Sequence, residues 1–224
     1  MLSTHAELLT PTEAAVVSSV DVRDVNRVID ERILPSDFYR VNPDRSRRLL
    51  AEACTLISFY FHAAKVLTAE ERVRAIAAAS SRLREDPVAL PEKEWIIRQD
   101  FLTIDLAPFL KSVHQKLAEL SKARALVVED PDILSGTPII RETRIPVYDV
   151  AASVSAGSPM NRILAAYPGL TPEMARLAAL YAVANPQRGR PREDRSPAVR
   201  GLAVSSRRTS RRKRAHEAAP RRMP

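Results

Sequence analysis

Glycine is scarce in this sequence: there are five among 224 residues, and all five lie at or after position 136. Glycine adopts positive φ at little cost, so its absence from the first 135 residues disfavours tight two-residue hairpins and glycine-rich phosphate loops there. Proline, in contrast, occurs 17 times. We therefore expect helices joined by turns that proline marks.

Cysteine and long apolar runs are also missing. The single cysteine, Cys54, excludes an internal disulfide framework and a cysteine-rich zinc site. The four histidines lack any HxxxH or Cys/His spacing, so we expect no bound metal or cofactor. No stretch approaches the roughly 18 apolar residues of a membrane span, and the start MLSTHAELLTP lacks the features of a signal peptide. We expect a cytoplasmic protein without membrane contacts.

Positive charge is concentrated near the C-terminus. Residues 186–224 hold 13 Lys and Arg against 3 Asp and Glu, whereas residues 1–185 hold 22 against 24. The tail is rich in Pro, Ser and Arg and short of large apolar side chains, so it cannot offset the entropy of folding by itself. We expect it to be disordered until bound, either as a nonspecific anchor for nucleic acid or as a specific ligand.

The N-terminal segment predicts two short helices. Thr10, Pro11 and Glu13 form a capping box with proline at the first helical position, which opens a helix. Residues 18–20 interrupt the pattern, and Asp21 can cap a second helix. Its apolar side is expected to comprise Val22, Val25, Val28 and Ile29. Because the following ERILPSDFYRV contains a Pro-Ser-Asp turn, residues 1–42 fit a winged helix-turn-helix.

The other side of the second helix carries candidate DNA contacts. Arg23, Asn26 and Arg27 lie at i, i+3 and i+4, and their donor groups suit guanine edges, adenine edges and phosphates. Thr12, in the first turn of the preceding helix, completes this candidate set. The alternative is a solvated outer face, paired with acidic residues of the same segment, since any amphipathic helix has one.

Residues 43–125 are expected to form a helical connecting and dimerisation region. Asn42 and Pro43 are expected to start a helix whose inward residues are Leu49, Leu50, Ala53, Leu56, Ile57, Tyr60 and Ala64. Its segment LISFYFHAAKVL is apolar on most sides, which indicates either the core or a subunit interface. A second capping box at residues 68–71 opens another helix, which should end at residues 85–87. The segment EWIIRQDFLTIDL reads as one or two strands, and Pro108 introduces a final helix.

Residues 126–185 predict a small domain resembling a helix-turn-helix. LVVE and PIIR flank a loop, a short strand can follow at residues 144–147, and Gly157 ends a helix that starts at Tyr148. Further helices are expected after Ser158 and after Thr171. Arg176 is the only basic side chain of the last helix, so this unit suits protein packing better than DNA reading. The acids of its loop, at positions 129, 130 and 132, fit a plain turn better than a metal site.

The run DPDILSGTPIIRETRIPV, followed by the AAYPGLT turn, resembles domain of unknown function 433 (DUF433), which is found in VapB-like antitoxins of bacterial type II toxin-antitoxin pairs. The matching positions are Pro131, Ile133, Gly136, Pro138, Ile140, Thr143, Arg144, Val147, Tyr167, Pro168 and Leu170. That family usually has glycine just before the Thr-Arg pair, where this chain has Glu142. If the position requires positive φ, Glu142 implies strain or a rearranged turn. The segment LTPTEAAVVSSVDVRDVNRVIDERILPSDFY is similar to the winged helix-turn-helix of longer members, of the MerR and excisionase kind.

This resemblance implies a non-enzymatic antitoxin that represses its own operon and neutralises a PIN-like ribonuclease toxin. A homodimer would set two recognition helices ~34 Å apart on a palindromic double-stranded operator. The nuclease gathers carboxylates around Mg²⁺, and arginines of the tail could pair with them and displace the metal. The candidates are Arg207, Arg208, Arg211, Arg212 and Arg214. The alternative is a stand-alone transcription regulator without a toxin, and no recognisable catalytic set supports an enzyme.

The sequence thus predicts a mainly α protein with short β elements in four parts. They are a winged helix-turn-helix (1–42), the helical connecting region (43–125), the antitoxin-type domain (126–185) and a disordered Arg-rich tail (186–224).

Overall fold

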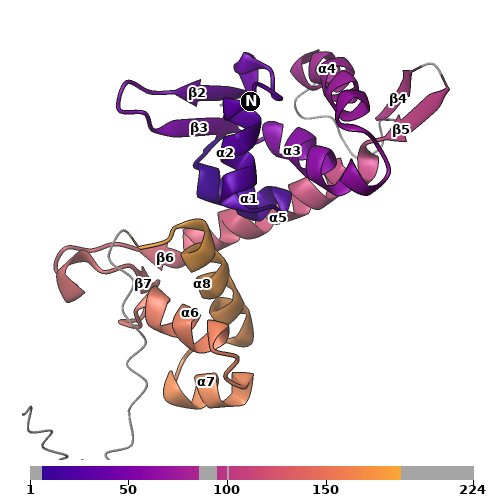
Figure 1. Ribbon diagram of the computed structural model, residues 1–224. Helices are drawn as coiled ribbons and strands as arrows, with labels where there is room; N and C mark the ends of the chain where they lie inside the picture. The colour runs from indigo at the N-terminus through magenta and orange to yellow at the C-terminus, as the bar shows by residue number, and fades with distance from the viewer. Residues whose placement is uncertain (1–6, 86–94, 100, 188–224) are drawn as a thin grey trace, which may run out of the picture. The chain divides into compact units, whose positions relative to one another are not determined.

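The structure is a computed structural model that describes residues 7–85, 95–99 and 101–187 (Figure 1). It confirms a mainly helical fold with short β elements, and every strand in the described part of the chain pairs antiparallel, in one three-stranded and two two-stranded sheets. Among the described residues, no helix has both the length and the apolar character needed to cross a membrane. Of the Arg-rich tail, only Pro186 and Gln187 lie within the described residues.

The N-terminal part places two helices beside a three-stranded sheet. Its elements are β1 (Leu8–Leu9), α1 (Pro11–Ser18), α2 (Val22–Asp30), η1 (Ser36–Phe38), β2 (Tyr39–Val41) and β3 (Arg47–Leu50), with strand order β1-β3-β2. The capping box is confirmed, because the Thr10 amide donates to Glu13 Oε2 (2.9 Å) and the Glu13 amide donates to Thr10 Oγ1 (3.2 Å). Helix α1 ends at Ser18 and is followed by the cap residue Ser19, whose φ is 57°. This left-handed residue turns the chain into α2.

A hairpin replaces the helix expected to begin at Asn42 and Pro43. The Asp44 side chain accepts hydrogen bonds from the amide (2.9 Å) and hydroxyl (2.6 Å) of Ser46, and Arg45 has a φ of 62°. These local bonds make a turn, and β3 then pairs with both β1 and β2. Positive φ at Arg45 shows that the tight turn forms without glycine. The chain thus forms a hairpin here without glycine, through a turn longer than the two-residue turns that the scarcity of glycine disfavours.

The middle region begins with helix α3 (Ala53–His62), the short turn η2 (Ala63–Lys65) and helix α4 (Ala69–Glu85). Leu56, Ile57 and Phe59 of α3 are buried in the first hydrophobic core, which confirms the core interpretation for this part of LISFYFHAAKVL, whereas Val66 is exposed. The second capping box is confirmed, since Thr68 and Glu71 exchange hydrogen bonds at the start of α4. Ala64, expected to face inward, is exposed in η2 because helix α3 has already ended. Of the expected helix end at residues 85–87, positions 86 and 87 lie outside the described residues.

The segment after α4 supplies a hairpin and the longest helix described. The segment expected to form one or two strands forms two, β4 (Ile96–Gln99) and β5 (Leu102–Asp105), which pair with each other. Helix α5 (Ala107–Leu126) follows, and Asp105 accepts a hydrogen bond from the Ala107 amide at its start. The expected inner stripe of this helix packs in or against the first core, and comprises Phe109, Leu110, Val113, Leu117 and Leu120.

The C-terminal part of the described chain has a core of its own, made of Ile140, Val147, Val150, Ile163, Leu170, Ala175 and Ala178. Its elements are β6 (Val127–Val128), η3 (Leu134–Gly136), β7 (Ile139–Ile140), α6 (Val147–Ser155), α7 (Met160–Ala166) and α8 (Pro172–Ala184).

Gly157, with a φ of 71°, follows the end of α6 as expected, and Thr171 caps α8 by accepting from the Met174 amide. The strand expected at residues 144–147 is absent, because only one isolated bridge joins Pro146 to Ile139. Helix α7 begins after Ser158 as expected, with Pro159 at its cap position.

Candidate nucleic-acid interface

Helix α2 is amphipathic, with one side in the first core and the other in solvent. Val25, Val28 and Ile29 are buried, as expected. Val22 is 38% exposed, because it lies in the first turn, beyond the edge of the buried face. Asp21 occupies the cap position, but its side chain makes no capping hydrogen bond. The core nevertheless fixes the orientation of α2 and leaves its polar face available to a ligand.

Two of the candidate DNA contacts, Arg23 and Arg27, are exposed on that polar face. Arg23 makes no ion pair with any residue that the structure describes. Arg27 Nε donates to Glu31 Oε1 at 2.9 Å, with both side chains more than half exposed. That hydrogen bond, together with the charge of Glu31, raises the pKa of Arg27. An exposed pair of this kind contributes little to stability, so the Arg27 guanidinium can exchange Glu31 for a phosphate or a base.

The third candidate, Asn26, is engaged within the protein. Its Nδ2 donates to the Val22 carbonyl at 3.0 Å, and its Oδ1 accepts from Arg47 Nη1 at 2.9 Å. Arg47 belongs to β3 and also donates two hydrogen bonds to Asp30, from Nη2 to Oδ1 at 2.5 Å and from Nη1 to Oδ2 at 3.3 Å. Asn26 therefore connects α2 to the hairpin.

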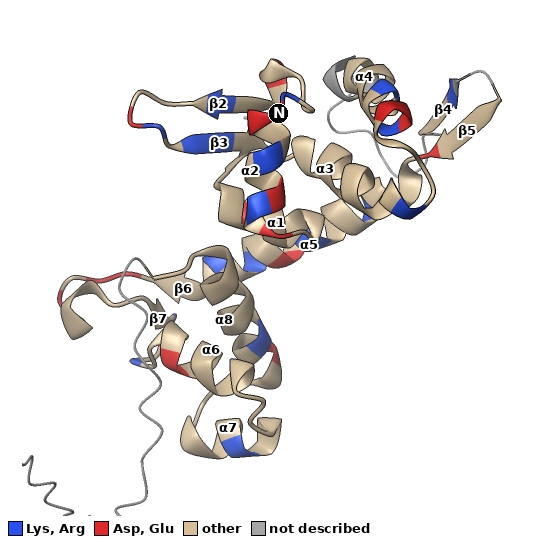
Figure 2. Ribbon diagram, viewed as in Figure 1, with Lys and Arg blue, Asp and Glu red and all other residues tan. Residues whose placement is uncertain are grey.

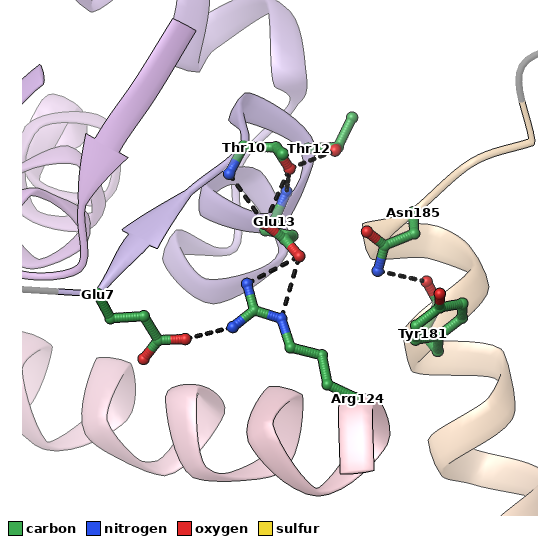
Figure 3. A network of polar contacts seen from close by, with 7 residues as sticks. All are labelled: Glu7, Thr10, Thr12, Glu13, Arg124, Tyr181 and Asn185. Atoms are coloured by element: carbon green, nitrogen blue, oxygen red, sulfur yellow. Dashed lines mark hydrogen bonds and ion pairs between the residues drawn. The ribbon is translucent and has the colours of Figure 1, made fainter. Parts of the chain in front are cut away.

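Thr12 lies apart from this group, in the capping network at the start of α1 (Figure 3). Its hydroxyl oxygen is 3.0 Å from that of Thr10. The structure thus brings Arg23, Asn26 and Arg27 onto one helix and places Thr12 with the residues that cap another.

The hairpin adds basic residues that the sequence pattern did not single out. Residues 39–50 contain four arginines and one acid, Asp44, and Figure 2 shows Lys and Arg on both strands of the hairpin. Arg40 lies directly opposite Arg48 in the register of β2 and β3. The RSRR run was a signal for this surface, but the segment had been assigned to a helix.

An ion-pair network joins α5 to the N-terminal segment (Figure 3). Arg124 Nε and Nη2 lie 3.1 and 2.8 Å from Oε1 of Glu13, whose side chain is only 6% exposed, and Arg124 Nη1 also pairs with Glu7. Burial by itself would lower the pKa of Arg124, but the hydrogen bonds and charges of both glutamates raise it above its ordinary value. Helix α8 packs on both α1 and α5, and its Ala184 joins the first core.

The motif positions of the C-terminal domain shape its turns. Gly136 has a φ of 77° and follows two other residues with positive φ. The Pro138 carbonyl accepts from the Val147 amide at 3.0 Å, which joins β7 to the start of α6. Thr143 Oγ1 donates to the Ile140 carbonyl at 2.7 Å and accepts from the Ile145 amide at 3.1 Å. Arg144 is exposed.

Glu142 has a φ of 60°, so the position before the Thr-Arg pair does adopt the conformation that glycine favours. In the preceding loop, Asp130 Oδ1 accepts from the Asp132 amide at 2.9 Å, in keeping with a plain turn. The five candidate toxin-binding arginines between positions 207 and 214 lie outside the described residues.

Comparison with known proteins shows which family this chain belongs to. The family model described as protein of unknown function (DUF433) matches residues 127–182. The uncharacterized protein y4eO of Sinorhizobium fredii is 50% identical over 212 residues, covering 93% of this chain and 95% of y4eO. This chain belongs to the same family as y4eO. The DUF433 domain expected from the motif around Gly136 is thereby confirmed.

Two solved structures are also similar. A DUF433 member from Anabaena variabilis is 31% identical, covers 48% of this chain and 88% of its own, and has a TM-score of 0.26. Rv2018 from Mycobacterium tuberculosis is 18% identical, covers 75% of this chain and 95% of its own, and has a TM-score of 0.32.

Proposed function

We propose that the chain is a type II antitoxin that binds operator DNA, represses its own operon and neutralises a PIN-like ribonuclease toxin. The observation that carries the DNA-binding half is the exposed polar face of α2 beside a basic hairpin. Helix, turn, helix and hairpin follow one another in the order of a winged helix-turn-helix of the MerR and excisionase kind. In such a unit the second helix enters the major groove and the first crosses the backbone.

The exposed arginines of α2 are the proposed readers of base edges. Arg23 and Arg27 lie four residues apart, which is about one helical turn, so both can reach the same stretch of groove. A guanidinium that donates to O6 and N7 of guanine supplies about 1–3 kcal/mol of discrimination. A homodimer presents two such helices to a palindromic operator, with half-sites ~34 Å apart.

The neutralising half of the proposal comes from the DUF433 resemblance and the basic tail. The tail offers five arginines between positions 207 and 214, each able to pair with a carboxylate in a two-pronged hydrogen bond. Inserted into the acidic cleft of a PIN-like nuclease, they would occupy the carboxylates that hold Mg²⁺ and so stop RNA cleavage.

The DNA-binding half is tested with the double variant Arg23→Ala/Arg27→Ala of the full chain. If both side chains contact bases, specific binding to the chain's own promoter weakens by about 2–6 kcal/mol, at 1–3 kcal/mol for each contact. The fold should survive, since neither residue belongs to the buried face of α2. Arg74→Ala is a matched control, because Arg74 is an exposed arginine of α4 with a long i,i+4 contact to Glu70. Unchanged specific affinity in the double variant would remove α2 from DNA readout.

The toxin-binding half is tested by co-expression with the product of any neighbouring short open reading frame that encodes a protein with several dispersed Asp residues. A stable complex that suppresses RNA cleavage supports the antitoxin. Alanine substitutions at positions 207, 208, 211, 212 and 214 should release the nuclease activity while leaving operator binding by α2 in place. If the chain binds its promoter and captures no nuclease, a stand-alone transcription regulator is the better description.

A further inference from the structure

The contacts around Arg47 point to a role within the proposed DNA-binding function, on which the following inference rests. We propose that Asn26, Asp30 and Arg47 form a strut that holds the β2–β3 hairpin against α2. The strut would position Arg40, Arg45 and Arg48 of the hairpin on DNA phosphates. Asn26 is then a positioning residue and reads no base.

The Arg47 guanidinium is committed to protein acceptors. Its Nη1 lies 2.9 Å from Asn26 Oδ1, 3.4 Å from the Asn26 carbonyl and 3.3 Å from Asp30 Oδ2, while Nη2 lies 2.5 Å from Asp30 Oδ1. Its side chain is only 25% exposed. A planar guanidinium that meets a carboxylate through two nitrogens fixes orientation as well as distance. Arg47 therefore has little capacity left for a phosphate.

Asn26 is held from both sides. Its amide nitrogen donates back to the Val22 carbonyl of α2, and its amide oxygen accepts from Arg47 of β3. Recognition of adenine would use one N–H and one oxygen of this same amide at once. The two existing bonds instead tie the polar face of α2, between Arg23 and Arg27, to the strand that carries Arg48.

The hairpin itself carries charge that an anionic partner would balance. Arg40 and Arg48 are directly opposite each other on β2 and β3, and like charges in that position destabilise a sheet. Arg45 lies exposed in the connecting turn. Asp44 is the only acid in residues 39–50, and its side chain is occupied by Ser46. The phosphate backbone of a duplex supplies negative charge along a line, which suits three basic residues on one hairpin.

For the substitution Asp30→Ala, the proposed strut and the net charge alone predict opposite changes in DNA affinity. Asp30 carries negative charge next to the proposed DNA face, so Asp30→Ala should tighten DNA binding if charge alone decides. If Asp30 anchors Arg47, the same substitution should weaken binding, because the hairpin loses its fixed position. Arg47→Lys separates the charge of Arg47 from its contact with Asp30. Lysine retains the charge for a phosphate but cannot reproduce the two-nitrogen contact with Asp30.

The experiment measures fluorescence anisotropy of two labelled duplexes, the chain's own promoter and a shuffled duplex of equal length, at several salt concentrations. The full-length wild type is compared with Asn26→Ala, Asp30→Ala, Arg47→Lys, Arg47→Ala and Asn26→Ala/Arg47→Ala. Circular dichroism melting checks that each variant folds. Arg74→Ala of α4 serves as the control for removing an exposed arginine.

Each strut variant should weaken binding to both duplexes by a similar factor, of about fivefold or more. The slope of log affinity against log salt should flatten by up to about 2.7, at roughly 0.9 for each of three lost phosphate contacts. The double variant should bind within twofold of Arg47→Ala alone, because both substitutions remove one strut. Arg47→Lys should resemble Arg47→Ala.

Three results would overturn the inference: tighter binding by Asp30→Ala, rescue by Arg47→Lys, or a loss in Asn26→Ala confined to the promoter duplex. The last would make Asn26 a base reader. A wild type that binds both duplexes equally would instead count against the proposed operator function, and the strut would still be judged on the shuffled duplex. A wild type that binds neither duplex would overturn both.

Discussion

Removal of the Arg124 guanidinium tests how the end of α5 is attached to the N-terminal helices. Arg124→Met keeps an unbranched apolar stem and deletes the charge. It removes the hydrogen bond from Nε to Glu13 Oε1 at 3.1 Å, the ion-pair contact of Nη2 with the same oxygen at 2.8 Å, and the contact with Glu7. Glu13 is left as a buried carboxylate whose other oxygen still accepts from the amide and hydroxyl of Thr10.

The size of the effect follows from burial. Deleting one partner of a buried ion pair costs about 3–5 kcal/mol. The Arg124 side chain is one-third exposed and Glu13 keeps its Thr10 donors, so we expect the lower end, about 3 kcal/mol. Glu7→Gln is the matched control at the other end of the network. The Glu7 side chain is 42% exposed, so its substitution should cost less than about 1 kcal/mol.

Urea denaturation followed by tryptophan fluorescence measures both values. The chain has one tryptophan, Trp95, which is 4% exposed in the first core and therefore reports the unfolding of that core. The double variant Glu13→Gln/Arg124→Met should lose less stability than the sum of the losses in Glu13→Gln and Arg124→Met measured separately. In the double variant both charges are removed together, so neither is left buried without a partner. A loss below 1 kcal/mol in Arg124→Met, or an equal loss in Glu7→Gln, would refute the reasoning.

Three further predictions concern single residues. Glu142→Gly should raise the free energy of unfolding by about 1 kcal/mol, because Glu142 is exposed and has a φ of 60°. Glu142→Ala should bring no such gain. A glycine variant that is less stable than the wild type in thermal melts would contradict this prediction. Burial raises the pKa of the Cys54 thiol to about 12, so the thiol stays protonated at pH 8. It should react with a disulfide reagent only after the chain is unfolded in guanidinium. Fast reaction of the native chain would contradict this prediction. Thr171→Ala should lower stability by about 0.5–2 kcal/mol through loss of the cap of α8, as measured by urea denaturation, and Thr171→Ser should restore most of it.

Features that depend on neighbouring residues were predictable from the sequence. The capping boxes at Thr10 and Thr68 join residues three apart, and both appear in the structure as expected. The resemblance to DUF433 also singled out position 142, because that family usually has glycine where this chain has Glu142, whose φ is 60°. In each case the physical cause lies within a few residues of the feature.

Features that depend on distant partners were not predictable. Leu49 and Leu50 have a spacing that suits a helix as well as a strand, and the strand is decided by pairing with Leu8 and Leu9, some 40 residues earlier. The contacts of Arg47 with Asp30 and of Arg124 with Glu13 span 17 and 111 residues. No local pattern specifies such pairs. The candidate DNA face was therefore predicted in part: the sequence indicated its helix and a wing within residues 1–42, but not the hairpin that β2 and β3 form.

Hydroxyl-radical footprinting of the DNA upstream of the chain's own gene tests the central proposal most directly. The wild type should protect two stretches about 10–10.5 base pairs apart, or a multiple of that spacing, as expected for two recognition helices on one face of the duplex. The Arg23→Ala/Arg27→Ala variant should lose this protection at the same protein concentration. Equal protection of a shuffled duplex, or an unchanged footprint in the double variant, would contradict operator binding through α2.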